Sequence, residues 1–150
     1  MAHALYYHTQ LPPEVPKHFG ASGIPTAWTS KTTYLWIQMG ATGIMVVTFP
    51  GLAWLIPKMP DSMINVTHKE YWLAAERRAA TRSYIGAQLL SFGSLTLLFL
   101  LAVFHQGNSV SLGRTQHMEY LGVSLSIYLI LTAVWCVLMY ARFRQIPPTS

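Results

Sequence analysis

Three long stretches without a charged residue constrain the fold of this chain more than any other feature. They cover residues 34–56, 84–104 and 120–140, and each is about 21 to 23 residues long. Because an α-helix rises roughly 1.5 Å per residue, each stretch is long enough to cross a hydrocarbon core of about 30 Å. A single segment in lipid satisfies its own backbone hydrogen bonds only as a helix. The sequence therefore predicts an all-α integral membrane protein, a single helical membrane domain over 1–150 with spans at about 34–56, 84–104 and 120–140.

The composition agrees with a membrane protein and argues against other classes. Of the 150 residues, 52% are hydrophobic and only 10% are charged, which exceeds what the core of one soluble domain needs. A soluble bundle of fully buried helices is the alternative, and three such runs in a short chain disfavour it. The net charge of +5 comes from basic residues beside the predicted spans. The expected partner is therefore a lipid bilayer with anionic head groups, and we expect no nucleic acid partner.

The distribution of Lys and Arg predicts the orientation. Seven of the ten basic residues lie in the 57–83 loop and the C-terminal tail, and three lie in the N-terminal segment and the 106–118 loop. Because loops rich in Lys and Arg stay in the cytoplasm, we expect the 57–83 loop and the C-terminus inside and the 8–32 loop outside. The expected location is the cell inner (cytoplasmic) membrane, with a multi-pass topology.

This orientation carries a polar N-terminal segment across the membrane. Residues 1–10 have neither the basic nor the apolar region of a signal peptide. Either the first span translocates its own N-terminus, or a further transmembrane helix precedes this chain. We favour the second, because residues 2–7 resemble the last turn of a helix, and we expect a fourth helix upstream.

Prolines and glycines punctuate the predicted outer loop. Four of the nine prolines and two of the ten glycines lie within residues 8–32, so no long helix is expected there. The early prolines favour an extended chain, and Gly20, Ser22 and Gly23 favour a turn around which the segment folds back. Phe19 and Trp28 flank this turn, and we expect them to dock at the membrane interface or against each other.

The stretch from Asn65 to Arg82 holds four of the ten basic residues between two spans. Thr67 and Glu70 have the spacing of a capping box, which predicts a helix that starts near His68 and runs unbroken into the second span.

On such a helix, Tyr71, Arg78 and Arg82 share one face. An aromatic ring and two cations on one face are typical of a helix anchored at an anionic membrane surface. The alternative is a docking site for a cytosolic protein, with Glu76 and the arginines as specificity contacts.

The available side chains do not indicate an enzyme or a cofactor site. No Asp, Glu, Lys or Arg lies within a span, which disfavours a pump or a channel formed by one chain. A Zn or Cu site built from His18, His105 and His117 with Glu14 or Glu119 is conceivable, but no pair has the spacing of a known metal motif. We expect His18 to orient the loop. A lone cysteine inside the third span excludes a disulfide framework. We therefore expect no catalytic site, no cofactor and no metal.

Two motifs, one span apart, resemble a known family. The first covers residues 11–31, LPPEVPKHFGASGIPTAWTSK, and the second covers residues 64–78, INVTHKEYWLAAERR. They are similar to the signature of a bacterial membrane domain of unknown function that also forms the N-terminal part of Sdp-type immunity proteins. The second motif departs from the family pattern at Thr67 and Ala75, where proline is usual. The motif residues that we single out are Pro12, Pro16, His18, Phe19, Gly23, Trp28, Lys31, Asn65, Tyr71, Trp72, Glu76, Arg77 and Arg78.

This resemblance carries the functional expectation. Sdp-type immunity proteins protect a cell from a secreted toxin and relay its presence by holding a transcriptional repressor at the membrane. The resemblance implies a non-enzymatic inner-membrane protein with a sensor or immunity-like role. The alternative is an accessory subunit, whose small span residues pack against other membrane helices of a larger complex.

Overall fold

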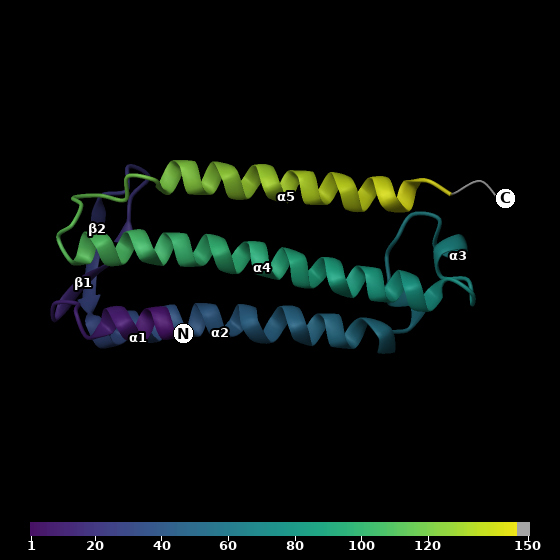
Figure 1. Ribbon diagram of the computed structural model, residues 1–150, viewed down its shortest axis with the longest axis horizontal. Coiled ribbons are helices and arrows are strands. Elements are labelled where there is room, and N and C mark those ends of the chain that lie inside the picture. The colour runs from purple at the N-terminus through teal and green to yellow at the C-terminus, as the bar shows by residue number, and fades with distance from the viewer. Residues whose placement is uncertain (147–150) are drawn as a thin grey trace. The chain divides into compact units, whose positions relative to one another are not determined.

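The computed structural model describes residues 1–146 and is mostly helical (Figure 1). Its elements in chain order are α1 (Ala2–His8), β1 (Glu14–Phe19), β2 (Pro25–Ser30), α2 (Lys31–Leu55), the 3-10 turns η1 (Ile56–Lys58) and η2 (Asp61–Met63), α3 (Lys69–Trp72), α4 (Arg78–Ser111) and α5 (Leu121–Arg144).

The three long helices confirm the predicted fold class. The segments Lys31–Lys58, Arg78–Ser111 and Leu121–Arg144 are each long and apolar enough to cross a membrane. The helix α4 extends beyond the predicted span of 84–104 at both ends. Its flanks are polar but contain no proline, so nothing in the sequence ends the helix where the apolar stretch ends.

The chain divides into two compact units, and α2, α4 and α5 each contribute to both. The first unit comprises Met1–Val46 and Leu95–Tyr128. The second comprises Val47–Ser94 and the described part of Leu129–Ser150. Each unit is considered separately below.

In the first unit, residues 14–30 form an antiparallel β-hairpin. The strands β1 and β2 pair around a turn in which Gly23 has φ +76°, a conformation that favours glycine. The predicted turn and fold-back are therefore confirmed. The register pairs Phe19 with Pro25 and Pro16 with Trp28. Phe19 and Trp28 consequently do not face each other, and that alternative of the sequence prediction is wrong.

In the second unit, the predicted unbroken helix is interrupted. The helix α3 ends at Trp72, and α4 begins only at Arg78. His68 precedes α3 with φ +53° and makes no side-chain capping bond, so the expected capping box with Thr67 and Glu70 does not form. Tyr71 is therefore separated from the helix that carries Arg78 and Arg82, and the predicted shared face does not exist.

Two arginines stabilise this interruption. A helix break removes the amide partners of preceding carbonyl groups, which then need other donors. Arg77 Nε donates to the carbonyl oxygen of Tyr71 at 3.0 Å, and Arg78 Nε donates to that of Leu73 at 3.2 Å. The spacing of apolar and polar residues along the sequence does not reveal bonds from side chains to the backbone. This explains why the sequence pattern alone predicted a continuous helix.

Candidate functional site

The segment that leads from Pro57 to the start of α4, residues 57–77, is folded onto the helices of the second unit. Trp72 is its anchor, with 6% of its surface exposed. Its indole Nε1 donates to the carbonyl oxygen of Phe143 at 3.1 Å, and the two rings meet edge to face at 5.4 Å. Thr81 Oγ1 donates to the carbonyl oxygen of Trp72 at 2.8 Å. These contacts hold α3 against both α4 and α5.

Arg82 binds the first residues of the same segment. Its guanidinium donates to the carbonyl oxygens of Pro57 and Met59, both at 2.6 Å, and to Asp61 Oδ1 at 2.7 Å. Arg78 Nη2 lies 3.0 Å from the other oxygen of the Asp61 carboxylate. One carboxylate thus binds two arginines, but only Arg82 also ties down the backbone after α2.

Arg82→Gln is expected to destabilise the protein far more than Arg78→Gln. Hydrogen bonds to charged groups contribute about 1.5–3 kcal/mol each, and Arg82, whose side chain is 14% exposed, would leave several partners behind. The Arg78 side chain is 48% exposed, so its ion pair with Asp61 contributes only about 0–1 kcal/mol. Arg78 also loses one bond to the Leu73 carbonyl oxygen, whereas Arg82 loses three bonds. Thermal unfolding of both variants in the same detergent measures the difference. Equal shifts in melting temperature would contradict the role assigned to Arg82.

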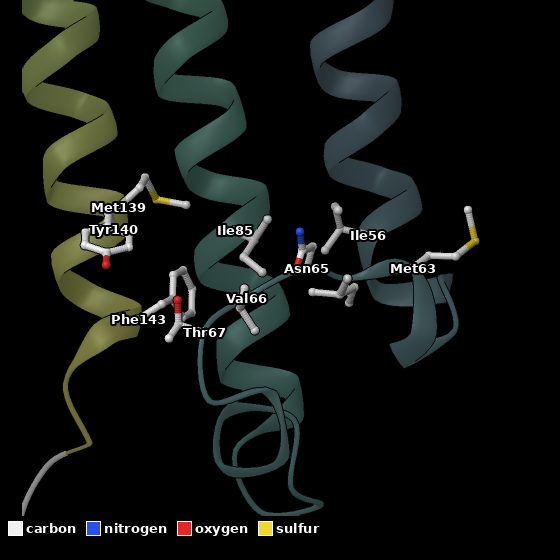
Figure 2. A pocket seen from close by; sticks show the side chains of 10 residues that line it. Ile56, Met63, Asn65, Val66, Thr67, Ile85, Met139, Tyr140 and Phe143 are labelled. Carbon is white, nitrogen blue, oxygen red and sulfur yellow. The ribbon is translucent and has the colours of Figure 1, made fainter.

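An apolar cavity of about 310 Å³ lies beside this segment. Figure 2 shows the chain from Met63 to Thr67 passing from the end of α2, across α4, towards Phe143 of α5. The cavity is lined by Ile56, Met63, Ile64, Asn65, Val66, Thr67, Ile85, Met139, Tyr140 and Phe143. The motif residue Asn65 is exposed and lines this apolar cavity.

A second cavity of about 260 Å³ carries two cations, and we call it the basic cavity. It is lined by Tyr71, Trp72, Arg77, Ala80, Thr81, Tyr84, Arg142 and Phe143. The guanidinium carbon of Arg142 lies 5.0 Å from the Trp72 ring centre and 5.6 Å from that of Tyr84. The guanidinium of Arg77 lies 3.9 Å from the Tyr71 ring centre. Aromatic faces thus hold both cations in place.

The predicted contact residues of the second motif separate into three environments. Arg77 lines the basic cavity, Arg78 pairs with Asp61, and Glu76 is exposed. Within residues 1–146, no salt bridge involves Glu76. Glu76 and Arg77 consequently have no charged partner among the described residues, and Glu76 is the more exposed of the two.

The first motif shapes the hairpin of the first unit. Val15 and Pro16 are buried, whereas His18 and Trp28 are exposed, Trp28 with 58% of its surface. The amide of Met118 donates to the carbonyl oxygen of Gly23 at 3.0 Å, so the hairpin turn is bonded to the loop between α4 and α5.

Other residues of the first motif support this arrangement. Lys31 begins α2, and its Nζ donates to the carbonyl oxygen of Leu11 at 3.4 Å. Pro12 is exposed in the preceding loop. Phe19 is half-buried, with its ring near the backbone of Gly107 in α4.

Sequence reasoning missed a buried amide pair in the same unit. Gln38 Nε2 donates to Asn108 Oδ1 at 3.0 Å, and these side chains, from α2 and α4, are 3% and 0% exposed. Gln38 is uncharged and did not stand out within the charge-free stretch 34–56, and Asn108 lies outside the predicted 84–104 helix.

A small aromatic cluster joins α1 to α4. The hydroxyl oxygen of Tyr7 lies 3.2 Å from His105 Nδ1, and the ring of His3 lies 4.8 Å from that of Tyr7 and 5.8 Å from that of His105. His105 therefore has neighbours that the sequence did not predict. Within residues 1–146, no three His, Cys, Asp or Glu side chains could hold a metal ion together, so the structure does not assemble the conceivable site of His18, His105 and His117.

This cluster predicts a loss of stability in acid. Burial lowers the pKa of His3 below its usual 6.5, and the charges of His105 and the N-terminus lower it further. The unfolded chain then binds this proton at a higher pH than the folded chain. The contribution of neutral His3 to the free energy of unfolding is fully present above about pH 6.5, and it is lost as the pH falls through the pKa of His3 in the folded chain. After correction for the intrinsic pH dependence of amide exchange, we expect weaker protection of the α1 amides at pH 5 than at pH 7.5, and His3→Gln should reduce this difference. An unchanged pH response in His3→Gln would contradict the assignment.

Comparison with known proteins finds a similarity in the N-terminal part of the chain. Residues 1–40 match the model of a family described as a domain of unknown function (DUF1648). This match contains the first motif and supports its assignment to a domain-of-unknown-function family, but it does not test the relation to Sdp-type immunity proteins, and the second motif lies outside it. No curated protein and no solved structure matches the sequence.

Proposed function

We propose that this chain is a membrane sensor with an immunity-like role, which presents the hairpin outside the cell and the 57–77 segment to the cytoplasm. The match of residues 1–40 and the three membrane-spanning helices fit a non-enzymatic membrane protein, which is the basis of the proposal.

The observation that carries the proposal is that both connecting regions are folded surfaces. The hairpin and the α4–α5 loop are joined by the Met118–Gly23 hydrogen bond, so they lie on one side of the membrane. The 57–77 segment and the end of α5 are joined by the Trp72–Phe143 bond, so they also share a side. We propose that α2, α4 and α5 each cross the membrane once between these regions, which would put the two surfaces on opposite sides. A protein that relays a signal across a membrane needs such a pair of ordered surfaces.

Each surface offers exposed groups for recognition. His18 and Trp28 are exposed on the hairpin, and aromatic side chains are frequent anchors at protein interfaces. Glu76 is exposed on the other surface beside the partly exposed Arg78. The excess of Lys and Arg in 57–83 and the tail supports a cytoplasmic location for this second surface.

Two sets of variants test the relay. Trp28→Ser and His18→Gln change the hairpin surface, and Glu76→Gln changes the other surface. Crosslinking in intact cells, followed by quantitative mass spectrometry, measures which cytosolic protein is captured and how much. We expect Glu76→Gln to reduce the capture directly and the hairpin variants to abolish its response to an external toxin. Lys17→Gln, another exposed change on β1, is the matched control. Unchanged capture and unchanged toxin sensitivity in all variants would end the sensor proposal.

One observation favours an accessory subunit as the second candidate. A Cβ atom added at Gly40, Gly51 or Gly122 would meet nothing within 4 Å. Glycines in membrane helices often allow close approach of another helix, and these three serve no contact among the described residues. Stoichiometric co-purification with a larger membrane assembly, lost when Gly40 and Gly122 are replaced by leucine, would favour this function over the sensor.

A further inference from the structure

The basic cavity of the second unit has the features of a site for an anion. Arg77 and Arg142 line it from two different parts of the chain, one before α4 and one in the last turn of α5. In the described residues 1–146, the salt bridges all involve Asp61, and neither of these two arginines takes part. Two cations therefore face one cavity without a carboxylate to neutralise them.

Both guanidinium groups are oriented before any ligand arrives. Arg77 is fixed by its Nε bond to the Tyr71 carbonyl and by the Tyr71 ring. Arg142 lies over the rings of Trp72 and Tyr84. The bond to Tyr71 uses only the Nε of Arg77, so its two terminal nitrogens remain available for a ligand. Terminal guanidinium nitrogens match the oxygens of a phosphate group as paired donors.

The position along the helices indicates where the anion comes from. Arg142 belongs to the last turn of the membrane-spanning α5, and Arg77 immediately precedes the membrane-spanning α4. Phosphate groups of lipids lie at this level of a bilayer. Tyr84 and Trp72 add the amphipathic rings that are typical of the interface.

The basic cavity and the apolar cavity share one lining residue, Phe143. Ile85 and Met139 also line the apolar cavity. A ligand with a phosphate group and a hydrocarbon chain matches a basic cavity that shares a lining residue with an apolar one better than a free phosphate ion does. Only the lipid also covers the apolar surface.

We infer that Arg77 and Arg142 form a specific binding site for the head group of an anionic phospholipid, with Phe143 and the apolar cavity receiving part of an acyl chain. This site is independent of the sensor role. It differs from general attraction of basic residues to a charged surface, because it requires these two arginines and not others of equal charge.

Native mass spectrometry of the detergent-purified full chain tests the site. The protein is titrated with phosphatidylglycerol and, separately, with phosphatidylcholine, which has the phosphate but no net charge. We expect one tightly retained phosphatidylglycerol and at least about tenfold weaker binding of phosphatidylcholine. Arg77→Gln combined with Arg142→Gln should weaken phosphatidylglycerol binding about ten- to hundredfold.

The matched control removes the same charge elsewhere in the second unit. Lys58 lies over the Trp54 ring and Arg144 near the Tyr140 ring, so Lys58→Gln with Arg144→Gln also removes two cations that contact aromatic rings. We expect this control to bind phosphatidylglycerol like the wild type. Equal weakening in both double variants, or none in either, would overturn the site.

Two further arms keep the test decisive. Should the glutamine variant fail to fold, Arg77→Lys with Arg142→Lys keeps the charge but loses the planar pair of donors, and we expect about tenfold weaker binding. Undiminished binding in that variant would contradict the site.

Inorganic phosphate is added as a competitor at the lipid concentration, and displacement of the lipid by it would show a free-phosphate site instead.

Discussion

Trp72→Ala is expected to lower the free energy of unfolding by about 3–5 kcal/mol, the usual cost of removing a large buried aromatic side chain. Trp72 is 6% exposed and packs edge to face on Phe143. Its removal also leaves the Phe143 carbonyl oxygen without the indole donor. Because these contacts hold the 57–77 segment, the same variant should open that segment to proteolysis. Thermal unfolding in detergent and limited proteolysis measure both effects.

Two other tryptophan variants serve as controls. Trp72→Phe keeps a ring but loses the donor, so we expect a smaller loss of about 1–3 kcal/mol. Trp54 is 64% exposed, and Trp54→Ala should change stability by less than about 1 kcal/mol. If Trp72→Ala unfolded at the same temperature as Trp54→Ala, the anchoring role of Trp72 would be wrong.

Gly23→Ala is expected to lower the free energy of unfolding by about 2–4 kcal/mol and to detach the hairpin turn from the α4–α5 loop. Gly23 has φ +76°, which strains any other residue. A Cβ atom there would also lie 2.8 Å from the carbonyl oxygen and 3.0 Å from the amide nitrogen of Met118. The substitution thus combines backbone strain with the loss of the hydrogen bond from the Met118 amide.

Gly113→Ala separates these two causes. Gly113 also has a positive φ, +67°, but an added Cβ meets nothing within 4 Å. Only backbone strain affects Gly113→Ala, so we expect this variant to lower the free energy of unfolding by about 1–2 kcal/mol. Hydrogen exchange at the Met118 amide should accelerate in Gly23→Ala and stay near the wild-type rate in Gly113→Ala. Equal exchange rates in the two variants would contradict the account of Gly23.

The helices were predictable because the membrane imposes a length and a composition on each span. The turn at Gly23 was also predictable, since glycine and proline restrict the backbone locally. The strand register was not, because the pairing of β1 with β2 shifts between Pro16 and His18 and between His18 and Phe19, and turn residues do not specify such irregularities. The break after α3 was missed because Trp72 is fixed by Phe143 of α5, a contact between residues far apart in sequence that no helical period contains.

The candidate sites were predictable only as motifs. The sequence singled out Arg77 and Arg78 as neighbours with one role, yet one lines the basic cavity and the other pairs with Asp61. Arg142 was counted only as a topology signal, and its approach to Trp72 required the folded helices. Gln38 and Asn108 come from different helices, and only the packed structure places them together.

The central claim is that the hairpin and the 57–77 segment face opposite sides of the membrane, and cysteine labelling tests it most directly. Cys136 is replaced by serine, and single cysteines are introduced at the exposed positions Lys17 and Arg114 and at Glu70. Intact cells are treated with a thiol reagent that does not cross the membrane. We predict labelling of Lys17→Cys and Arg114→Cys in intact cells and of Glu70→Cys only after lysis. Labelling of all three positions from the same side would contradict the account.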